Sequence, residues 1–497
     1  MREHGHTNTA THGVASGPTV HAVHTVHAPI PNGPVLRGYQ VRALDDCRGA
    51  IRAGKRRVLL VAPTGSGKTT IAAEIIRSAI ARGSRVLFLA HRQELLDQCH
   101  GRLLEFGVAS GIIRAADPRQ DRDQAVQVAS VQTMVRRLKQ FPEDAFDLII
   151  VDEAHHTRAN TYAKILDHFS GARAVLGLTA TPIRADGRGL AESYDVLVEA
   201  ASMRELVQLG FLVPAKTYTT PTSLDLTGIH RRQGDYVLSE LGQRMNRETL
   251  VGNIVTEWQR LASDRRTVVF ATTVAHSQSI ASRFADAGIP AEHLDGSMAD
   301  AERDAILARV RSGDTQVVVN CQLLTEGWDM PEISCCVLAR PTKSSGLYLQ
   351  MSGRALRPAP GKADCIILDH GNCFREHGGI SDRQWTLTAD KPKTGGEAPE
   401  KSCPGCGLII ALGCLECPEC GFVFARPSGS SREKAVQLVD ASDPEFRRVR
   451  FFEIVHDVSR RRRADGEPYK ITAALVMFHE QFGEWPAWSW QEEAGIR

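Results

Sequence analysis

Residues 62–69, which are Ala-Pro-Thr-Gly-Ser-Gly-Lys-Thr, have the types and the spacing of a phosphate-binding loop. Gly65 and Gly67 permit a tight turn in which backbone N–H groups surround phosphate oxygens. Lys68 can reach the β- and γ-phosphates of a nucleotide, and Thr69 can bind Mg²⁺. Alanine takes the place of the first glycine of the general pattern. The segment predicts a site for a nucleoside triphosphate and Mg²⁺.

The elements on either side of this loop must hold it in place. Val58 to Val61 form an apolar run of the length of a buried strand, and the apolar residues of segment 71–76 mark one face of a helix. The loop would therefore connect the carboxyl end of a strand to the start of a helix, where the free N–H groups favour a bound anion. An ordinary glycine turn between strand and helix is the alternative.

A pair of carboxylates follows a second buried strand. Segment 146–151 is a nearly continuous apolar run of the kind that a parallel, doubly covered sheet buries, and it ends at Asp152 and Glu153. Asp152 would hold Mg²⁺ together with Thr69, and the contact of Asp152 would run through the water shell of the ion. Glu153 would orient or deprotonate the water that attacks the γ-phosphate of ATP. A solvated acidic turn is the alternative, and it does not explain why both halves of the site follow in the expected order.

With these two segments the chain resembles the superfamily 2 helicases, in particular the DEAH-type branch that includes UvrB-like and XPB-like DNA helicases and type III restriction translocases. The resemblance covers residues 36–372. It implies that Gln40 hydrogen-bonds the adenine base, and Ala62 is the residue that this family commonly carries at the start of the loop. The residues expected around the nucleotide are Gln40, Pro63, Thr64, Gly65, Ser66, Gly67, Lys68, Thr69, Gly327 and Asp329.

Three further segments in the first half are similar to motifs of this family. Residues 87–95 and 130–133 resemble the motifs that touch the nucleic-acid backbone, and residues 178–182 resemble the motif that couples hydrolysis to strand movement. The residues that the resemblance implies are Arg92, Ser130 and Thr133 for nucleic-acid contact and Thr179 and Thr181 for coupling.

The second half carries segments 325–331 and 350–357, which resemble the remaining family motifs. In the family, Arg354 and Arg357 would be arginine fingers that reach across a cleft to the γ-phosphate, and Gln350 would help to sense the nucleotide. A planar, permanently charged guanidinium can stabilise the charge that grows on phosphate oxygens in the transition state. For a single arginine, a surface salt bridge is the alternative. The predicted catalytic residues are Lys68, Asp152, Glu153, Gln350, Arg354 and Arg357.

Strand-like and helix-like segments alternate through both halves, which predicts an α/β fold with parallel sheets. The resemblance implies two tandem RecA-like lobes with ATP in the cleft between them. The expected domains are a disordered, His-rich extension (1–34), an ATP-binding lobe (35–202), a linker (203–257), a second lobe (258–390), a zinc ribbon (400–427) and a basic, aromatic C-terminal module (428–497).

Two CPxCG units provide cysteines with the spacing of a metal site: Cys403 with Cys406, and Cys417 with Cys420. Each unit turns tightly, so that four thiolates can form a closed tetrahedral Zn²⁺ site. Cys414 also lies three residues before Cys417, but the glycine that follows Cys420 favours the later pair. Redox chemistry is the alternative, and it needs an exposed pair of thiols.

Composition limits the remaining possibilities. The chain has 497 residues, of which 42% are hydrophobic, and it contains no apolar run of membrane-spanning length. The 60 Lys and Arg residues are almost balanced by 58 Asp and Glu residues. Nucleic-acid binding must therefore come from a local groove or patch of positive charge. The N-terminal extension lacks a secretory core and cysteines pair as CxxC, which together predict a reducing, cytoplasmic location.

These features predict an ATPase that nucleic acid stimulates and a DNA helicase, with ATP, Mg²⁺ and Zn²⁺ as its cofactors. The choice of DNA over RNA, and of strand separation over translocation alone, follows from the resemblance. One alternative is the translocase subunit of a restriction or defence assembly, which would need a separate nuclease. The partner protein would then be a nuclease or a replication or repair protein. Another alternative is a nucleic-acid-binding factor for which ATP is a conformational switch. The arginines and tryptophans of the tail could grip phosphates and stack on bases, or form a basic turn beside a small aromatic core.

Overall fold

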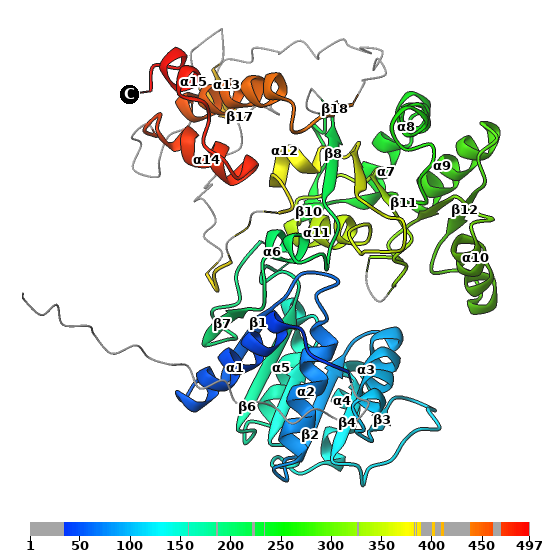
Figure 1. Ribbon diagram of the computed structural model, residues 1–497, viewed down its shortest axis with the longest axis vertical. Coiled ribbons are helices and arrows are strands. Elements are labelled where there is room, and N and C mark those ends of the chain that lie inside the picture. The colour runs from blue at the N-terminus through cyan, green and yellow to red at the C-terminus, as the bar shows by residue number, and fades with distance from the viewer. Residues whose placement is uncertain are drawn as a thin grey trace, which may run out of the picture.

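Short runs of aliphatic and β-branched residues form the strands of two mainly parallel sheets in the computed structural model (Figure 1). The structure describes residues 34–157, 159–184, 187–220, 224–232, 234–325, 328–381, 383, 385–388, 400–402, 409–411, 438–460 and 469–496. The His-rich extension and the four cysteines expected to bind zinc lie outside the described residues.

The first lobe is a sheet of seven parallel strands in the order β3-β4-β2-β5-β6-β1-β7. Its central strands are buried along their whole length, as the apolar runs predicted, because helices cover both faces. The strands are β1 (Arg57–Val61), β2 (Val86–Ala90), β3 (Gly111–Ile113), β4 (Val126–Ser130), β5 (Leu148–Val151), β6 (Ala174–Thr179) and β7 (Val196–Glu199).

The helices of the first lobe divide between the two faces of the sheet. Apolar side chains of α1, α2 and α3 pack with one set of strand residues, and those of α4 and α5 pack with the alternate set. The helices are α1 (Gly38–Arg52), α2 (Lys68–Ile80), α3 (Gln93–Glu105), α4 (Val131–Arg137), α5 (Asn160–His168) and α6 (Met203–Gln208), with short 3₁₀ turns at Leu138–Gln140 and Ala154–His156.

The second lobe has a seven-stranded sheet in the order β12-β13-β11-β14-β15-β8-β18, in which only β18 runs antiparallel to its neighbour. The strands are β8 (Ala215–Thr219), β11 (Thr267–Phe270), β12 (Ala291–Leu294), β13 (Val317–Asn320), β14 (Cys335–Leu338), β15 (Cys365–Asp369) and β18 (Val439–Asp440). The helices are α7 (Leu238–Met245), α8 (Glu248–Leu261), α9 (Val274–Asp286), α10 (Asp300–Ser312), α11 (Ser345–Gly353) and α12 (Cys373–His377). The prediction of an α/β protein with two parallel-sheet lobes is confirmed.

The segment expected as a linker, 203–257, contributes directly to the second lobe. Strand β8 pairs with β15, and apolar residues of α8 pack into the core beneath β11 and β13. A short hairpin of β9 (Arg231–Arg232) and β10 (Asp235–Tyr236) lies between them in sequence. Asp235 accepts hydrogen bonds from the Thr342 hydroxyl (2.7 Å) and the Lys343 N–H (2.8 Å), which attaches the hairpin to the loop after β14.

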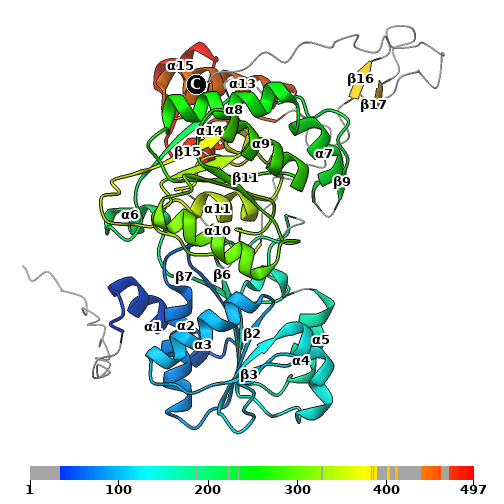
Figure 2. The ribbon, with the colours of Figure 1, turned by 90° about the vertical axis from the view of Figure 1, so that its right-hand side faces the viewer.

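The C-terminal helices α13 (Pro444–Arg460), α14 (Ala473–Phe482) and α15 (Trp488–Glu493) dock on the second lobe, on the side away from the first (Figure 2). Strand β18 extends the second sheet at the edge strand β8. Phe374 of α12 packs against Phe446 and Phe482, and the Gly379 N–H donates to the Gln481 carbonyl at 2.9 Å. The C-terminal helices and the second lobe therefore form one packed unit.

Residues 385–388 leave the second lobe and return to the first. The Leu387 carbonyl accepts hydrogen bonds from the Leu190 N–H (2.8 Å) and the Ala191 N–H (3.1 Å), and its side chain packs on the first lobe. Trp385 packs beside it. No helix among the described residues is long and apolar enough to span a membrane.

Candidate active site

The loop predicted to bind phosphate connects β1 to α2. Gly65 and Gly67 have φ angles of +87° and +82°, the left-handed region that glycine adopts without strain. A Cβ on Gly67 would lie 2.5 Å from Nε2 of Gln40, so a larger residue at this position would displace the Gln40 side chain. The loop thus places its N–H groups and Lys68 at the start of α2, where an anion is favoured.

Two side chains of α1 hydrogen-bond to the backbone of the phosphate loop. The Tyr39 hydroxyl and Nε2 of Gln40 both donate to the Ser66 carbonyl, at 2.6 and 3.0 Å, and Oε1 of Gln40 accepts from the Arg37 N–H at 2.9 Å. Gln40, which the resemblance assigns to the adenine base, is buried in this network. Tyr39 was not among the predicted site residues, although it lies next to Gln40 in the same segment.

The two carboxylates lie at the carboxyl end of β5. Asp152 and Glu153 are both buried, and the Glu153 N–H donates to Oδ1 of Asp152 at 2.9 Å. Burial, together with the adjacent Glu153 charge, raises the pKa of Asp152 well above its ordinary value, against the opposing effect of Lys68. Two buried acids beside a single lysine favour the binding of a divalent cation, which would stabilise both in the ionised form. The donor set of Thr69 and Asp152 therefore fits Mg²⁺.

Glu153 has a φ of +48°, unusual for a residue with a side chain. This conformation turns the chain sharply after Asp152, and Oε2 of Glu153 lies 3.4 Å from Nδ1 of His155. Backbone strain of this kind occurs preferentially at functional sites.

His155 also connects the acids to the predicted coupling segment. Its Nδ1 lies 3.4 Å from the Thr179 hydroxyl, which in turn donates to the Thr181 carbonyl at 2.8 Å. The Ala62 N–H, at the start of the phosphate loop, donates to the Thr179 carbonyl at 2.9 Å. Thr179 thus contacts both halves of the predicted site. His155 was not among the predicted site residues, although it lies two residues after Glu153.

The second lobe closes over the loop through α11. A Cβ on Gly353 would lie 3.0 Å from Cβ of Thr64, and a Cβ on Gly346 would lie 3.0 Å from the Thr181 hydroxyl, so glycine permits this close approach. Gln350 is buried in the same helix. The phosphate loop and the coupling segment therefore both lie against one helix of the second lobe.

The two predicted arginine fingers differ in their surroundings. Arg357 lies against Gly65 and forms an ion pair with Asp329, and its burial lowers its pKa to about 10. Arg354 turns toward its own lobe, where it donates to the carbonyls of Trp328 and Thr325. Only Arg357 reaches the phosphate loop in this arrangement. Gly327 lies outside the described residues.

Each half of the chain matches a known family. Residues 34–184 match the family described as type III restriction enzyme, res subunit, and residues 247–359 match the helicase conserved C-terminal domain. The chain is 35% identical over 363 residues to the candidate ATP-dependent helicase IRC3 of Saccharomyces cerevisiae, which covers 68% of this chain and 52% of the yeast protein. It is 32% identical over 373 residues to a 51.5 kDa protein of a Lactococcus phage, covering 74% of this chain and 78% of that protein.

The chain belongs to the superfamily 2 helicases of the restriction-translocase type. This confirms the family that the motifs indicated. The chain spans about half the length of its yeast relative, 52%. Two solved structures share its fold. One is a fragment of a candidate HsdR subunit of a type I restriction enzyme from Vibrio vulnificus (TM-score 0.56, 24% identity, 71% of this chain and 67% of that chain). The other is the ATP-dependent type ISP restriction-modification enzyme LlaBIII bound to DNA (TM-score 0.51, 20% identity, 68% and 28%).

The predicted nucleic-acid contacts of this chain lie at the carboxyl ends of neighbouring strands. Arg92 follows β2, and Ser130 ends β4, to which β2 is paired. The Ser130 hydroxyl donates to the Gln132 side chain at 2.8 Å, and Gln132 donates to the His91 carbonyl at 3.3 Å, which joins the two segments. Thr133 is half-buried in the following helix, α4. Nη1 of Arg92 lies 3.5 Å from the Leu323 carbonyl of the second lobe.

The first pair of predicted zinc ligands falls between two described strands. In β16 (Glu400–Ser402) and β17 (Ile409–Ala411), which pair antiparallel, Ser402 is opposite Ile409. Cys403 and Cys406 lie between these two strands in the sequence. These cysteines, like Cys417 and Cys420, lie outside the described residues.

Proposed function

We propose that this chain is an ATPase that nucleic acid stimulates, and that it couples Mg-ATP hydrolysis between its two lobes to movement along DNA or to separation of DNA strands. The observation that carries the proposal is the contact of α11 with Thr64 and Thr181. Through this helix, one lobe meets both the phosphate loop and the coupling segment, so binding of a nucleotide and relative motion of the lobes are linked.

The residues suggest how the hydrolytic step proceeds. The loop N–H groups and Lys68 bind the phosphates, and Glu153 orients and deprotonates the attacking water. Thr69 and Asp152 would hold Mg²⁺, which neutralises phosphate charge when bound. Arg357, already beside Gly65, stabilises the charge that develops on the γ-phosphate. Gln350 and Arg354 belong to the same segment, and Arg354 acts by holding the loop after β13 in place.

Strand movement would follow from the change in contacts on hydrolysis. Loss of the γ-phosphate would remove an anionic partner of Arg357, which follows α11, and so weaken the contact of the second lobe with the phosphate loop. Thr179 and His155 pass this change to the edge of the first sheet, where Arg92, Ser130 and Thr133 would hold the nucleic-acid backbone. DNA is favoured over RNA because the family includes restriction enzymes, and LlaBIII was solved bound to DNA.

Zinc binding is part of the proposal. The antiparallel pairing of β16 with β17 supports a zinc ribbon, because the connection between the strands carries Cys403 and Cys406. The described part of the chain has seven cysteines, all of them free thiols, which supports work in a reducing, cytoplasmic compartment. A partner nuclease or a replication or repair protein would be a further component and not a part of this chain.

The experiment that tests the proposal is steady-state ATP hydrolysis by the zinc-loaded protein without nucleic acid and with single-stranded DNA, duplex DNA or single-stranded RNA. We expect DNA to stimulate turnover, and we expect Lys68→Ala and Glu153→Gln to abolish turnover while DNA binding persists. Turnover that is absent, or that no nucleic acid changes, would reject the motor and leave the ATP-switched binding factor. Undiminished turnover in either variant would reject the proposed site.

A further inference from the structure

An arginine stacked on a phenylalanine lies beside the phosphate loop. The guanidinium carbon of Arg37 lies 3.9 Å from the ring centroid of Phe211. Arg37 directly precedes α1, and Phe211 follows α6, so the pair joins the beginning and the end of the first lobe. Neither residue was among the predicted site residues.

Two independent contacts place this pair next to the phosphate loop. Nη1 of Arg37 donates to the Tyr39 hydroxyl at 3.2 Å, and that hydroxyl donates to the Ser66 carbonyl of the loop. A Cβ on Gly65 would lie 3.2 Å from Cδ2 of Leu212, the residue that directly follows the stacked phenylalanine. The pair therefore lies beside the position of a nucleotide whose phosphates the loop would bind.

The pair presents two flat groups to a ligand. Arg37 is exposed, and Phe211 is half-buried. The ring of Tyr39 supports that of Phe211, with centroids 5.6 Å apart, and the Phe211 N–H donates to the Leu206 carbonyl at 2.8 Å, which fixes the phenylalanine in place. A planar guanidinium and an aromatic ring are both groups on which nucleobases stack. This surface therefore fits a planar base.

The Gln40 side chain, by contrast, is already engaged at both ends. Its Oε1 accepts from the Arg37 N–H at 2.9 Å, and its Nε2 donates to the Ser66 carbonyl at 3.0 Å. Only 3% of the residue is exposed. To bind adenine, Gln40 would have to share or break bonds that hold the phosphate loop, and breaking buried hydrogen bonds costs free energy. This arrangement leaves the affinity for the base to another group.

We propose that Arg37 and Phe211 form a stacking platform for the base of the bound nucleotide, and that Gln40 supports the loop. The inference rests on the proposed function and deepens it, because it names how the base is held. Since any base can stack, the platform contributes affinity with little selection among nucleoside triphosphates. The Val213 N–H, two residues after Phe211, donates to the Leu356 carbonyl at 2.8 Å. The platform is thus joined to the segment of the predicted arginine finger.

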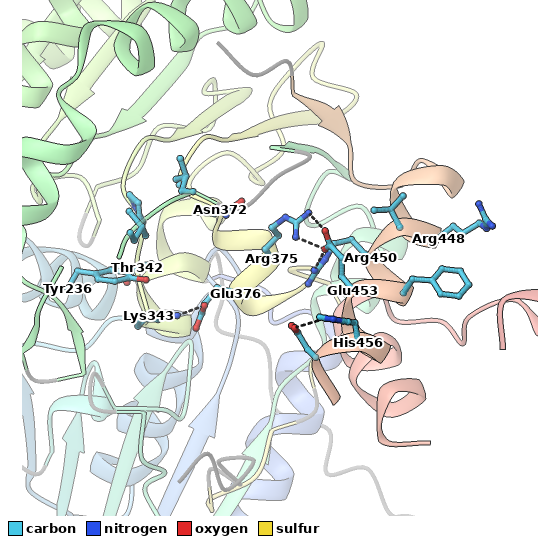
Figure 3. Close-up of a pocket in the computed structure, with 17 residues that line it drawn as sticks. Tyr236, Thr342, Lys343, Asn372, Arg375, Glu376, Arg448, Arg450, Glu453 and His456 are labelled. Carbon is cyan, nitrogen blue, oxygen red and sulfur yellow. Dashed lines mark hydrogen bonds and ion pairs between the residues drawn. The ribbon is translucent and has the colours of Figure 1, made fainter. Parts of the chain in front are cut away.

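The chain contains a second arginine–phenylalanine pair, which provides a matched control. The guanidinium carbon of Arg448 lies 5.6 Å from the ring centroid of Phe452, which is half-buried like Phe211. Arg448 and Phe452 line a groove of about 900 Å³ between the second lobe and α13, the helix that docks away from the first lobe (Figure 3). Removal of the Phe452 ring therefore leaves the nucleotide site intact.

The test compares ATP with inorganic triphosphate, which has the phosphates and no base. Steady-state hydrolysis by the full-length, zinc-loaded protein gives KM and kcat for ATP, and competition gives the inhibition constant of inorganic triphosphate. Phe211→Ala removes the ring, whereas Phe211→Tyr keeps one. Arg37→Lys keeps the charge and loses the planar face. Phe452→Ala is the control, and thermal unfolding of each variant identifies any loss of folding.

We expect Phe211→Ala to raise KM for ATP about tenfold with little change in kcat, and Arg37→Lys to raise KM about threefold, because the base loses a stacking partner. The inhibition constant of inorganic triphosphate should not change in either variant. Phe211→Tyr and Phe452→Ala should keep the wild-type KM.

An equal loss of affinity for ATP and inorganic triphosphate in Phe211→Ala would show damage to the phosphate loop. An unchanged KM in the same variant would show that the base lies elsewhere. Either result overturns the platform alone, provided that Lys68→Ala still abolishes turnover. If the wild type hydrolyses no ATP with or without DNA, the proposed function fails, and the platform with it.

Discussion

Arg357 of the second lobe lies directly against Gly65 of the phosphate loop: a Cβ on Gly65 would be 3.4 Å from Cγ and 3.6 Å from Nε of Arg357. The guanidinium is mostly buried, with a side-chain exposure of 18%, and it pairs with Asp329. A permanently charged group is thus already present where the phosphates of a nucleotide would lie.

Arg357→Ala should therefore reduce ATP turnover by about 10³-fold or more, the range found for arginine fingers, while nucleotide binding changes far less. The measurement is kcat in the presence of DNA alongside the affinity for a fluorescent ATP analogue. Arg173→Ala, at an exposed arginine of the first lobe that pairs with Asp147, is the matched control and should leave both values unchanged. A turnover within tenfold of the wild type would show that Arg357 is not the finger.

The Thr179 hydroxyl should matter for coupling more than for hydrolysis itself. It donates to the Thr181 carbonyl, accepts from the Thr181 N–H at 3.1 Å and lies near His155. Thr179→Val keeps the shape but loses these bonds, so we expect the basal ATPase rate to persist and stimulation by DNA to fall several-fold. Thr267→Val removes an equally buried hydroxyl, which bonds Trp258 at 2.7 Å in the second lobe. Each variant should lose about 1–3 kcal/mol of stability, but only the first should lose stimulation.

Stability at low pH should depend on Asp117. Its carboxylate accepts hydrogen bonds from Nε and Nη2 of Arg119, at 3.0 and 2.8 Å, and these lower its pKa to about 2. Because an unfolded aspartate titrates near 3.9, the ionised form stabilises the fold above about pH 4, and this stabilisation is lost as the pH falls toward 2.

Between pH 5 and pH 2, the wild type should therefore lose roughly 1–2 kcal/mol more stability than Asp117→Asn. The difference in unfolding midpoint between the two proteins, followed across this range, measures the effect. Asp144→Asn, at an exposed carboxylate, should follow the wild-type profile. A constant difference between wild type and Asp117→Asn at all pH values would contradict the assignment.

The four predicted zinc ligands can be separated from the neighbouring cysteine. The purified protein should contain one equivalent of zinc per chain, measured by elemental mass spectrometry. Serine at Cys403, Cys406, Cys417 or Cys420 should each remove most of it, because a closed site needs all four thiolates. Cys414→Ser should retain the metal. If Cys414→Ser loses zinc and Cys420→Ser keeps it, the second pair is Cys414 with Cys417.

The sequence contains strong local signals for the first half of the site. An apolar run followed by a glycine-rich loop specifies β1, the loop and α2, because the glycines occupy backbone conformations that other residues avoid. The position of Asp152 and Glu153 could also be predicted, because they directly follow an apolar run that forms a buried strand. These predictions needed only short-range patterns.

Features that depend on distant contacts were not predicted. Strand β8 pairs with β15, about 150 residues later, and β18 has only two residues. Neither segment contains a local signal for the strand with which it pairs, so the extent of the second sheet could not be predicted from the sequence. Likewise, motif order cannot tell that Arg354 turns to its own loop while Arg357 faces the phosphate loop, because that depends on side-chain packing.

The hydrogen bonds of Leu387 with Leu190 and Ala191 have a consequence for the cysteine-rich part of the chain. One end of the stretch between Leu387 and Leu438 is attached to the first lobe, and the other end joins the second sheet through β18. Any rotation of one lobe against the other changes the distance that this stretch must cover. The two attachment points, Leu387 on the first lobe and Leu438 beside β18, therefore move apart or together with the lobes.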